Sequence, residues 1–322
     1  MLKKIVTNSL SNRKKIKLSN TLTVLIVFIS LFILFSLINK QFISYYNIRC
    51  MLNNMVVAGI IALGLTPLMI SGGIDISFGP SVALTTVVMA QLYNAGANLW
   101  VSLLIGVIVA VIIGFINGIL IESFNLTPLL LTLGTLGVLQ GLALVLSNSK
   151  TVGILTDELY FFSTTNFLRI PPPVWIFIVL ILICWIIMNY TKSGMWIRAI
   201  GGDTESSRLF GIPVKKVRII LYAFTGLSVG IASIMYISFT GVAVPFYGPN
   251  LTLVTLSSIL VGGISLTGGS GSVWGTVIGI LIMGIVFNAL SVFNLPSNYI
   301  QICQGVILIT VVASYEVKKN KK

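Results

Sequence analysis

The chain has 322 residues, of which 56% are hydrophobic and 8% are charged, whereas soluble domains carry roughly 25% charged residues. So few charged side chains cannot cover a globular protein of this length with a polar surface, which excludes a soluble globular fold. The net charge of +13 does not indicate nucleic-acid binding, because the basic residues form short clusters between apolar stretches. The composition predicts an all-α, polytopic membrane protein that contacts anionic lipid and binds no nucleic acid.

The titratable and sulfur-containing residues limit the chemistry of the chain. The sequence contains no histidine, which excludes histidine triads, histidine metal sites and histidine proton relays. The three cysteines, Cys50, Cys184 and Cys303, are far apart and lie in or beside apolar segments, as expected of packing residues. We therefore expect no catalytic residues, no metal and no cofactor.

A basic segment, residues 1–21, precedes a series of apolar segments. A bilayer core requires ~20 apolar residues per helix, and by this measure the chain contains about ten candidate spans. They are expected near residues 22–38, 51–71, 78–93, 100–121, 127–146, 174–190, 219–240, 250–266, 272–292 and 299–314. No small-residue cleavage pattern follows the first of them, so it is predicted to be a retained helix and not a signal peptide. The sequence thus predicts a transmembrane domain over 22–315 and a basic tail over 316–322.

The positions of the basic clusters predict the topology. Clusters lie at the amino end, in the loop 191–218 and at the carboxyl end, and basic loops favour the cytoplasmic side. An even number of predicted spans separates each cluster from the next, so all three can lie on that side. We expect a multi-pass protein of the bacterial cytoplasmic membrane with both termini cytoplasmic and the segment 147–173 facing outward.

A run of helix-breaking residues interrupts the apolar pattern between the second and third segments. It reads Gly-Gly-Ile-Asp-Ile-Ser-Phe-Gly-Pro from Gly72 to Pro80 and contains one acid, Asp75. A broken helix at membrane depth is tolerated only where it is buried in protein or lines a wet cavity, which makes Asp75 a candidate pathway residue. The alternative is a cytoplasmic turn in which Asp75 caps the next helix, and hydropathy does not decide between the two.

A similar string, Gly-Gly-Ile-Ser-Leu-Thr, recurs from Gly262 to Thr267. It predicts an internal repeat, as in many transporter folds, although chance similarity in a membrane chain rich in glycine, isoleucine and serine is an alternative. Residues 263–270 nearly spell a P-loop, but Gly269 occupies the position of the lysine that contacts the phosphates. The chain is therefore expected to bind no nucleotide, and any ATP is used by a partner.

Glycines four positions apart recur in the apolar segments. Gly271, Gly275 and Gly279 have this spacing, which places them on one face of a helix and allows a neighbouring backbone to approach closely. The spacing also occurs in the pairs Gly114 and Gly118, Gly137 and Gly141, and Gly226 and Gly230. These glycines are predicted to mediate helix packing, with a subunit interface as the alternative.

The loop 191–218 is the longest polar interval in the second half of the chain. Asp203 or Thr204 can cap a short helix that ends near Phe210 and Gly211. Such a helix, with Leu209 and Phe210 exposed at one end, suits docking into a groove of a partner. The alternative is a solvated connecting loop.

Five motifs in order identify a family resemblance. They are Gly-Gly-Ile-Asp-Ile-Ser at 72–77, Ile-Asn-Gly at 116–118, Thr-Pro-Leu to Thr-Leu-Gly-Thr at 127–135, the loop at 198–213, and Val-Gly-Gly-Ile-Ser-Leu-Thr-Gly-Gly-Ser-Gly-Ser to Gly-Thr at 261–276. Together they resemble the ribose, xylose, arabinose and autoinducer-2 class of ABC permeases, over residues 50 to 315. The segment Asp203 to Arg208 departs from the family, whose members usually carry a small-residue pair there.

The resemblance implies a sugar permease that works with three partners. These are a second permease, either a copy or a paralogue, a cytoplasmic ATPase that hydrolyses the ATP, and an extracytoplasmic solute-binding protein. It implies a coupling helix that contacts the ATPase through Asp203, Glu205, Arg208, Leu209, Phe210 and Gly211. It also implies a position near the sugar pathway for Asp75, Asn117 and Thr132.

An ion-coupled secondary transporter of a small polar solute is the alternative function. The broken helices and the repeat favour it. The predicted spans contain few acidic residues, however, and Asp75 and Glu122 are poorly suited to form a relay that must bind and release protons.

Overall fold

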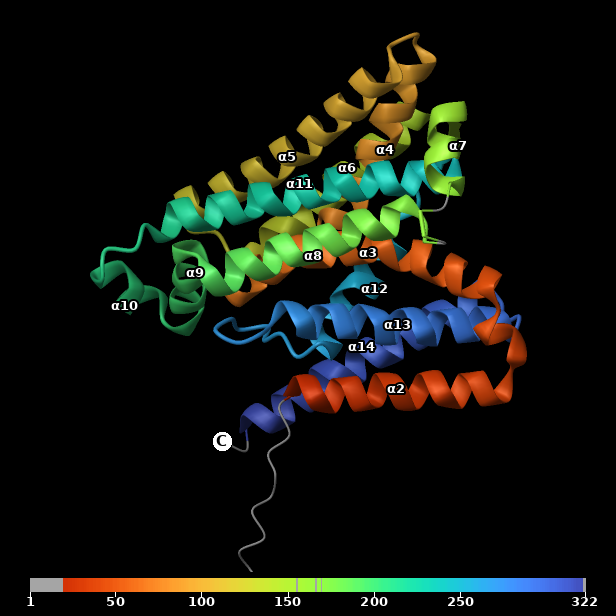
Figure 1. Ribbon diagram of the computed structural model, residues 1–322. Coiled ribbons are helices and arrows are strands. Elements are labelled where there is room, and N and C mark those ends of the chain that lie inside the picture. The colour runs from red at the N-terminus through yellow and green to blue at the C-terminus, as the bar shows by residue number, and fades with distance from the viewer. Residues whose placement is uncertain (1–19, 155, 166, 169, 321–322) are drawn as a thin grey trace, which may run out of the picture.

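The computed structural model describes residues 20–154, 156–165, 167–168 and 170–320, which form a bundle of long helices (Figure 1). Their order is α2 (Asn20–Ile38), η1 (Lys40–Ile43), α3 (Tyr45–Ile70), α4 (Phe78–Asn94), α5 (Leu99–Phe124), α6 (Pro128–Ser147), α7 (Asp157–Thr164), α8 (Pro172–Tyr190), α9 (Lys192–Gly202), α10 (Thr204–Leu209), α11 (Val214–Thr240), α12 (Gly248–Val261), α13 (Val273–Val292) and α14 (Ser297–Asn320). Two short strands, β1 (Val152–Gly153) and β2 (Val242–Ala243), pair antiparallel. The predicted all-α membrane fold is confirmed.

Each of the ten segments predicted as spans overlaps a helix, although the segment 250–266 extends into the break after α12, and fewer helices are long enough for a full crossing. Among the described residues, six helices have the length and apolar composition to cross a membrane: α3, α5, α6, α8, α11 and α13. The apolar parts of α2, α12 and α14 are shorter, and α4 has 17 residues. The expected count of about ten full-length spans is therefore not reproduced.

Two of the shorter helices adjoin the two glycine-rich breaks. Helix α4 begins after the break at residues 71–77, and α12, with 14 residues, ends before the break at residues 262–272. At 1.5 Å per residue these helices measure ~25 Å and ~21 Å, whereas a hydrocarbon core is ~30 Å thick. Each of these two helices is therefore shorter than a full crossing and adjoins a non-helical break.

Helix α3 forms the centre of the bundle. All residues from Met55 to Ile70 are buried, which agrees with a segment that is apolar around its whole circumference. Helix α11 packs along both α3 and α5, and glycines bring the backbones of α5 and α11 together. A Cβ atom at Gly114 would collide with the carbonyl of Tyr222, and one at Gly226 would collide with the carbonyl of Ala110.

The glycines of α13 face the backbone of α12. A Cβ atom at Gly279 would collide with the carbonyl of Ser258, and one at Gly275 would collide with the carbonyl of Gly262. Gly271 was expected on the same helix face, but it precedes α13. Its φ of +151° is one that residues other than glycine rarely adopt. Gly271 therefore shapes the loop that leads into α13, and only Gly275 and Gly279 of the three lie in the helix contact.

A single methyl group at the contact between α5 and α11 should destabilise the protein. We expect Gly226→Ala to lower the stability by about 1–3 kcal/mol, because the new Cβ must displace backbone atoms of α5. Gly305→Ala in α14 is the matched control, since a Cβ there meets no atom within 4 Å. Thermal unfolding of the detergent-solubilised variants measures the difference. Equal unfolding temperatures for both variants would show that the helices do not approach this closely.

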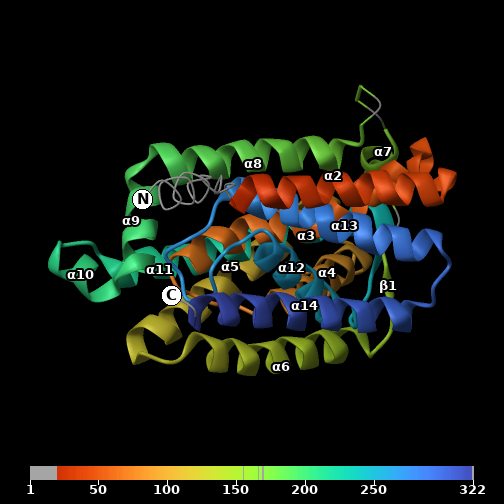
Figure 2. The same ribbon diagram turned by 90° about the horizontal axis from the view of Figure 1, so that it is seen from below.

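The bundle has two distinct ends. Helices α9 and α10 lie at one end, together with the first turn of α2 and the last turn of α14 (Figures 1 and 2). Strand β1 and α7, which belong to the segment 147–173, lie at the opposite end (Figures 1 and 2). The basic segment predicted at residues 1–21 lies almost entirely outside the described residues.

Candidate functional site

The first break in the bundle begins where α3 ends. Gly72 adopts a φ of +84°, and the Gly73 N–H donates to the Leu68 carbonyl at 3.0 Å, so the last turn closes on a left-handed glycine. The chain then runs without helical structure to Phe78, the first residue of α4. Within the break, Ser71, Asp75 and Ser77 are buried. The glycine pair therefore turns a polar segment into the interior of the bundle.

A chain of hydrogen bonds joins this break to α5 and α6. The Asp75 Oδ1 atom accepts hydrogen bonds from the Ser77 N–H at 2.8 Å and from Ser77 Oγ at 2.6 Å. The Asn117 Nδ2 atom of α5 donates to Ser77 Oγ at 3.0 Å. Thr135 of α6 donates through Oγ1 to Asn117 Oδ1 at 2.9 Å. These four residues, Asp75, Ser77, Asn117 and Thr135, are called the polar network below.

Three residues of the polar network, Asp75, Ser77 and Asn117, are buried, and Thr135 is partly buried. Helix α5 ends at Phe124, seven positions after Asn117, which places the amide ~10 Å from the helix end. The hydroxyl of Tyr222, in the third turn of α11, donates to the Ile74 carbonyl at 3.0 Å. Asp75 does accept a hydrogen bond from a backbone N–H just before α4, as the turn interpretation expected, but it does so at a buried position.

The structure unites two of the three predicted pathway residues. Asp75 and Asn117 are linked through Ser77, whereas the fully buried Thr132 donates to the Pro128 carbonyl of its own helix at 2.9 Å. The residue of α6 that contacts Asn117 is Thr135, one turn later. Sequence reasoning missed Ser77 and Thr135, although a hydroxyl two positions after an aspartate is a recognisable turn signal.

The second break repeats the local turn of the first and contacts it. The Thr267 N–H donates to Ser265 Oγ at 3.2 Å, as the Ser77 N–H does to Asp75. The left-handed glycines differ in register, because Gly263, with a φ of +85°, corresponds to Gly73 in the two strings, whereas the left-handed glycine of the first break is Gly72. The Gly269 N–H donates to the Ile70 carbonyl at 2.9 Å and so caps the end of α3. The two breaks therefore meet at the α10 end of the bundle.

Arg218 connects the first break to the segment at the α10 end. Its Nη2 atom donates to the Ser71 carbonyl and to Thr204 Oγ1, both at 3.0 Å. Its Nη1 atom lies 3.5 Å from Glu122 Oε1, near the end of α5. One guanidinium thus joins the ends of α3 and α5 to α10 and α11, a role that only its planar array of donors allows. Sequence reasoning did not single out Arg218.

Helix α10 is a capped, protruding helix. The Asp203 Oδ1 atom accepts from the N–H groups of Glu205 and Ser206 at 2.9 and 3.2 Å. Hydrogen bonds from Ser206 and Glu205 hold the pKa of Asp203 below its usual range. Arg208 Nη1 lies 3.2 Å from Glu205 Oε2, and Gly211 ends the turn with a φ of +80°. The predicted cap, helix and stop are all present in this segment.

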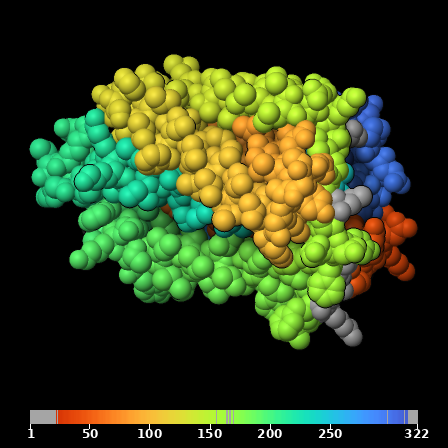
Figure 3. All heavy atoms as spheres, turned by 90° about the horizontal axis from the view of Figure 1, so that it is seen from above, coloured from red at the N-terminus to blue at the C-terminus, as the bar shows by residue number. Residues whose placement is uncertain are grey.

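The apolar tip of α10 is open to solvent. Leu209, the last residue of α10, is 83% exposed, and Phe210, which caps the helix end, is 86% exposed. In the space-filling view the chain around residues 205–215 protrudes at the left of the molecule (Figure 3). Two large apolar side chains are thus exposed together at a protruding tip, which is the arrangement expected of a docking helix.

Comparison with known proteins places this arrangement in a family. The family model described as "Branched-chain amino acid transport system / permease component" matches residues 47–312. The chain belongs to this permease family. The matched range contains the polar network, Arg218 and α10.

Individual relatives of the permease cover most of its length. The Autoinducer 2 import system permease protein LsrD of Yersinia enterocolitica is 30% identical over 294 residues, 89% of each chain. The L-arabinose ABC transporter permease protein AraH of Azospirillum brasilense is 31% identical over 306 residues, 95% of this chain and 90% of the relative. The L-arabinose transport system permease protein AraH of Escherichia coli is 30% identical over 298 residues, 92% and 91% of the two chains. No solved structure matches the permease.

These relatives confirm the resemblance drawn from the five motifs. The permease is similar to the arabinose and autoinducer-2 group, and the apolar helices make it a multi-pass protein of the inner membrane. Among the described residues no group of three or more cysteine, aspartate or glutamate side chains could hold a metal ion. Besides neutral polar groups, the site contains the carboxylates of Asp75 and Asp203 and the two ion pairs Arg218–Glu122 and Arg208–Glu205.

Proposed function

We propose that the permease is the membrane-spanning subunit of an ATP-driven importer for a sugar or sugar-like solute. A solute-binding protein delivers the solute on one side of the membrane, and a separate ATPase hydrolyses ATP on the other. The observation that carries this proposal is the link from α10 through Thr204 and Arg218 to the Ser71 carbonyl. It ties an exposed docking helix to a buried break in the bundle.

The coupling works through the contacts that the Arg218 guanidinium makes with Thr204 on one side and with Ser71 and Glu122 on the other. Movement of α10, imposed by closure of the ATPase, displaces Thr204 and with it the guanidinium. The guanidinium also holds the ends of α3 and α5, through Ser71 and Glu122, so these ends shift together. The break at 71–77 follows directly after α3 and transmits the shift to Asp75. This sequence of direct contacts provides a physical route from ATPase to pathway.

Asp75, Asn117 and Thr132 are assigned to the pathway, with Ser77 and Thr135 added by their hydrogen bonds. Their role is to wet the pathway and to position hydroxyl groups, since a neutral sugar requires neither a counter-ion nor a proton relay. The Oδ1 atom of Asp75 accepts two hydrogen bonds from Ser77. This use of the carboxylate supports a structural and wetting role over proton transfer. The solute is assigned to the monosaccharides, with ribose-like pentoses first.

The topology proposed for the permease has ten crossings, with α4 and α12 completed by the glycine breaks. An even number places the start of α2 and the end of α14 on one side, and both lie at the α10 end (Figure 1). That end is assigned to the cytoplasm because it carries the basic residues of the 191–218 loop. The matching turns at Asp75 and Ser265 support an internal repeat.

A second permease, either a copy or a paralogue, completes the proposed complex. Helix α6 is the least buried of the six long apolar helices. A Cβ atom at Gly137 or Gly141 of this helix would meet no atom within 4 Å, unlike the glycines between α5 and α11. An open small-residue face of this kind suits close approach of another helix. The partner permease is therefore assigned to the α6 face.

Transport in sealed vesicles tests the proposed function. Vesicles containing the permease, its ATPase and its solute-binding protein are expected to accumulate sugar only when the ATPase is supplied with ATP. An imposed ion gradient without ATP should drive no uptake. Gradient-driven uptake in the absence of ATP would instead support an ion-coupled secondary transporter, for which the two broken helices are the favourable observation.

A further inference from the structure

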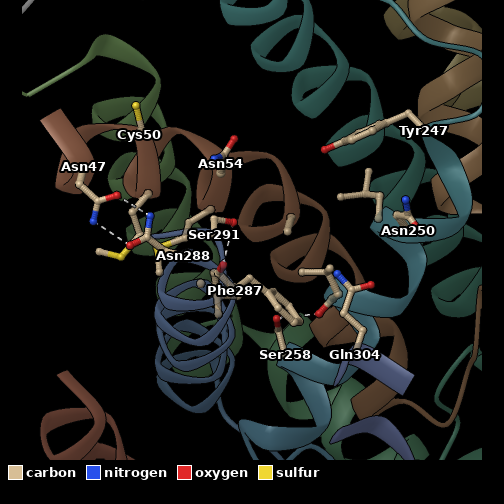
Figure 4. Close-up of a pocket in the computed structure, with 17 residues that line it drawn as sticks. Asn47, Cys50, Asn54, Tyr247, Asn250, Ser258, Phe287, Asn288, Ser291 and Gln304 are labelled. Atoms are coloured by element: carbon tan, nitrogen blue, oxygen red, sulfur yellow. Dashed lines mark hydrogen bonds between the residues drawn. The ribbon is translucent and has the colours of Figure 1, made fainter. Parts of the chain in front are cut away.

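A cavity of about 420 Å³ lies between α3, α12, α13 and α14 (Figure 4). Its volume falls within the roughly 300–1,000 Å³ typical of small-molecule sites. The lining begins in the first turn of α3 at Asn47 and reaches Ala58 in the middle of α3 and Ser258 in the last turn of α12. The cavity thus extends from the first turn of α3 to the last turn of α12, and it shares no residue with the polar network.

The chemistry of the lining is neutral and rich in amides. Five amide side chains contribute to it: Asn47, Asn54, Asn250, Asn288 and Gln304. Among the described residues that line the cavity, none is aspartate, glutamate, lysine or arginine. Amides both donate and accept hydrogen bonds, as hydroxyl groups do, whereas a charged solute would lose its hydration without gaining a counter-ion. The lining therefore favours an uncharged, hydroxyl-bearing solute.

Gln304 of α14 lines the cavity, and its side chain carries a buried acceptor, Oε1, that no described group uses. Its residue is only 6% exposed, and its Oε1 atom accepts no hydrogen bond from the described part of the chain. A buried acceptor without a partner costs about 1–3 kcal/mol, so it binds a hydroxyl donor favourably. Figure 4 shows Gln304 beside Ser258 of α12. Gln304 and Ser258 form a polar patch in a part of the cavity lining that is otherwise largely apolar.

The amides at the α3 end of the cavity are of two kinds. Asn47 and Asn288 satisfy each other, with Nδ2 to Oδ1 distances of 2.8 and 2.9 Å in the two directions (Figure 4). This pair forms a fixed wall between α3 and α13. Asn54 and Asn250 are exposed and lie on opposite helices, α3 and α12, where the cavity opens. Tyr247 and Phe287 add aromatic surface, which suits the C–H face of a sugar ring.

We propose that this cavity binds an uncharged polyhydroxylated solute of monosaccharide size within a single permease subunit. Gln304 bonds the solute in the interior, and Asn54 and Asn250 bond it where the cavity opens. The inference rests on the proposed transport function, because a solute is expected to reach this end of the bundle from its binding protein. The cavity would be a second binding site for the solute in each subunit, separate from the polar network at Asp75.

Cys50 is a native reporter for this site, because it lines the cavity and is partly exposed. In a Cys303→Ser background the remaining thiol, Cys184, is buried. The rate at which N-ethylmaleimide alkylates Cys50 in the purified full-length permease is measured by mass spectrometry. The probes are a panel of neutral pentoses and hexoses and the aldonic acids of the same sugars. We expect at least one neutral sugar to slow alkylation and its acid to have no effect.

Two variants and one control identify the residues that bind the sugar. Gln304→Leu and Asn250→Leu should each weaken the protecting sugar about tenfold, because each removes a hydrogen bond inside or at the opening of the cavity. Gln301→Leu is the matched control, since Gln301 lies on the same helix and is exposed. Asn250→Leu changes an exposed position and keeps the test informative if Gln304→Leu does not fold.

Three results with sugars and their acids would overturn the proposed site. They are absence of protection by every neutral sugar, equal protection by the acids, or protection that survives both Gln304→Leu and Asn250→Leu. Slowing of alkylation by added lipid and not by sugar would assign the cavity to an acyl chain and would also overturn the proposal. Recovery of the ATPase with the same preparation is recorded separately. Its presence without sugar protection would reject this site while leaving the proposed function intact.

Discussion

Replacement of Arg218 by methionine is expected to destabilise the permease and to uncouple ATP hydrolysis from transport. The change leaves Glu122 buried, 6% exposed in its side chain, without its cation. Removing one partner of a buried pair typically costs 3–5 kcal/mol, and the partial exposure of Arg218 places the expected loss at about 3 kcal/mol. Thermal unfolding in detergent measures this loss.

A double variant separates stability from coupling. In Arg218→Met with Glu122→Leu, both charges are absent, and apolar replacement of a buried pair is often neutral for stability. We expect this double variant to recover most of the unfolding temperature. Coupling should remain impaired, because Ser71 and Thr204 still lack the guanidinium donor. The readout is the ratio of sugar transported to ATP hydrolysed. A double variant with wild-type coupling would show that Arg218 has only a structural role.

Replacement of Leu209 by aspartate is expected to weaken association with the ATPase strongly. Leu209 and Phe210 are almost fully exposed at the tip of α10, so the change removes apolar contact area and leaves a charge in the docking groove. Loss of a central apolar anchor at an interface costs about 2 kcal/mol or more, which corresponds to roughly a 30-fold weaker complex. The exposed position predicts unchanged folding and membrane insertion.

A second leucine at the same end of the bundle supplies the control for this variant. Leu126 lies in the short connection between α5 and α6 and is 42% exposed, but it is not part of α10. Leu126→Asp introduces the same charge outside the docking tip and is expected to leave ATPase association unchanged. Co-purification of ATPase with each tagged variant gives the comparison. Equal recovery with Leu209→Asp and wild type would reject the docking role of α10.

Much of the fold follows from local signals in the sequence. Apolar length predicts every long helix, and the signals at Asp203 and Gly211 predict the boundaries of α10, because caps and stops depend on neighbouring residues only. The glycine spacing predicts close helix packing, but it does not identify the partner helix. Gly114 and Gly226 lie far apart in the chain, and only the tertiary structure brings α5 against α11.

The candidate site is less accessible to sequence reasoning, because its contacts join distant segments. Asp75 and Asn117 stand out as polar residues in apolar surroundings, yet their link passes through Ser77, an ordinary hydroxyl. Arg218 resembles any other basic residue of a cytoplasmic loop, and its three partners lie on three other segments. How deep the break at Asp75 lies within the bundle depends on the unequal lengths of α4 and α5. Hydropathy does not predict these lengths.

Co-purification of the tagged permease from its native membrane tests the central claim most directly. Mass spectrometry of a mild-detergent preparation is expected to find an ATPase and a solute-binding protein together with the permease. The ATPase should be lost from the Leu209→Asp variant and kept in Leu126→Asp. Recovery of the permease without any ATPase, in repeated preparations of the wild-type protein, would contradict an ATP-driven importer.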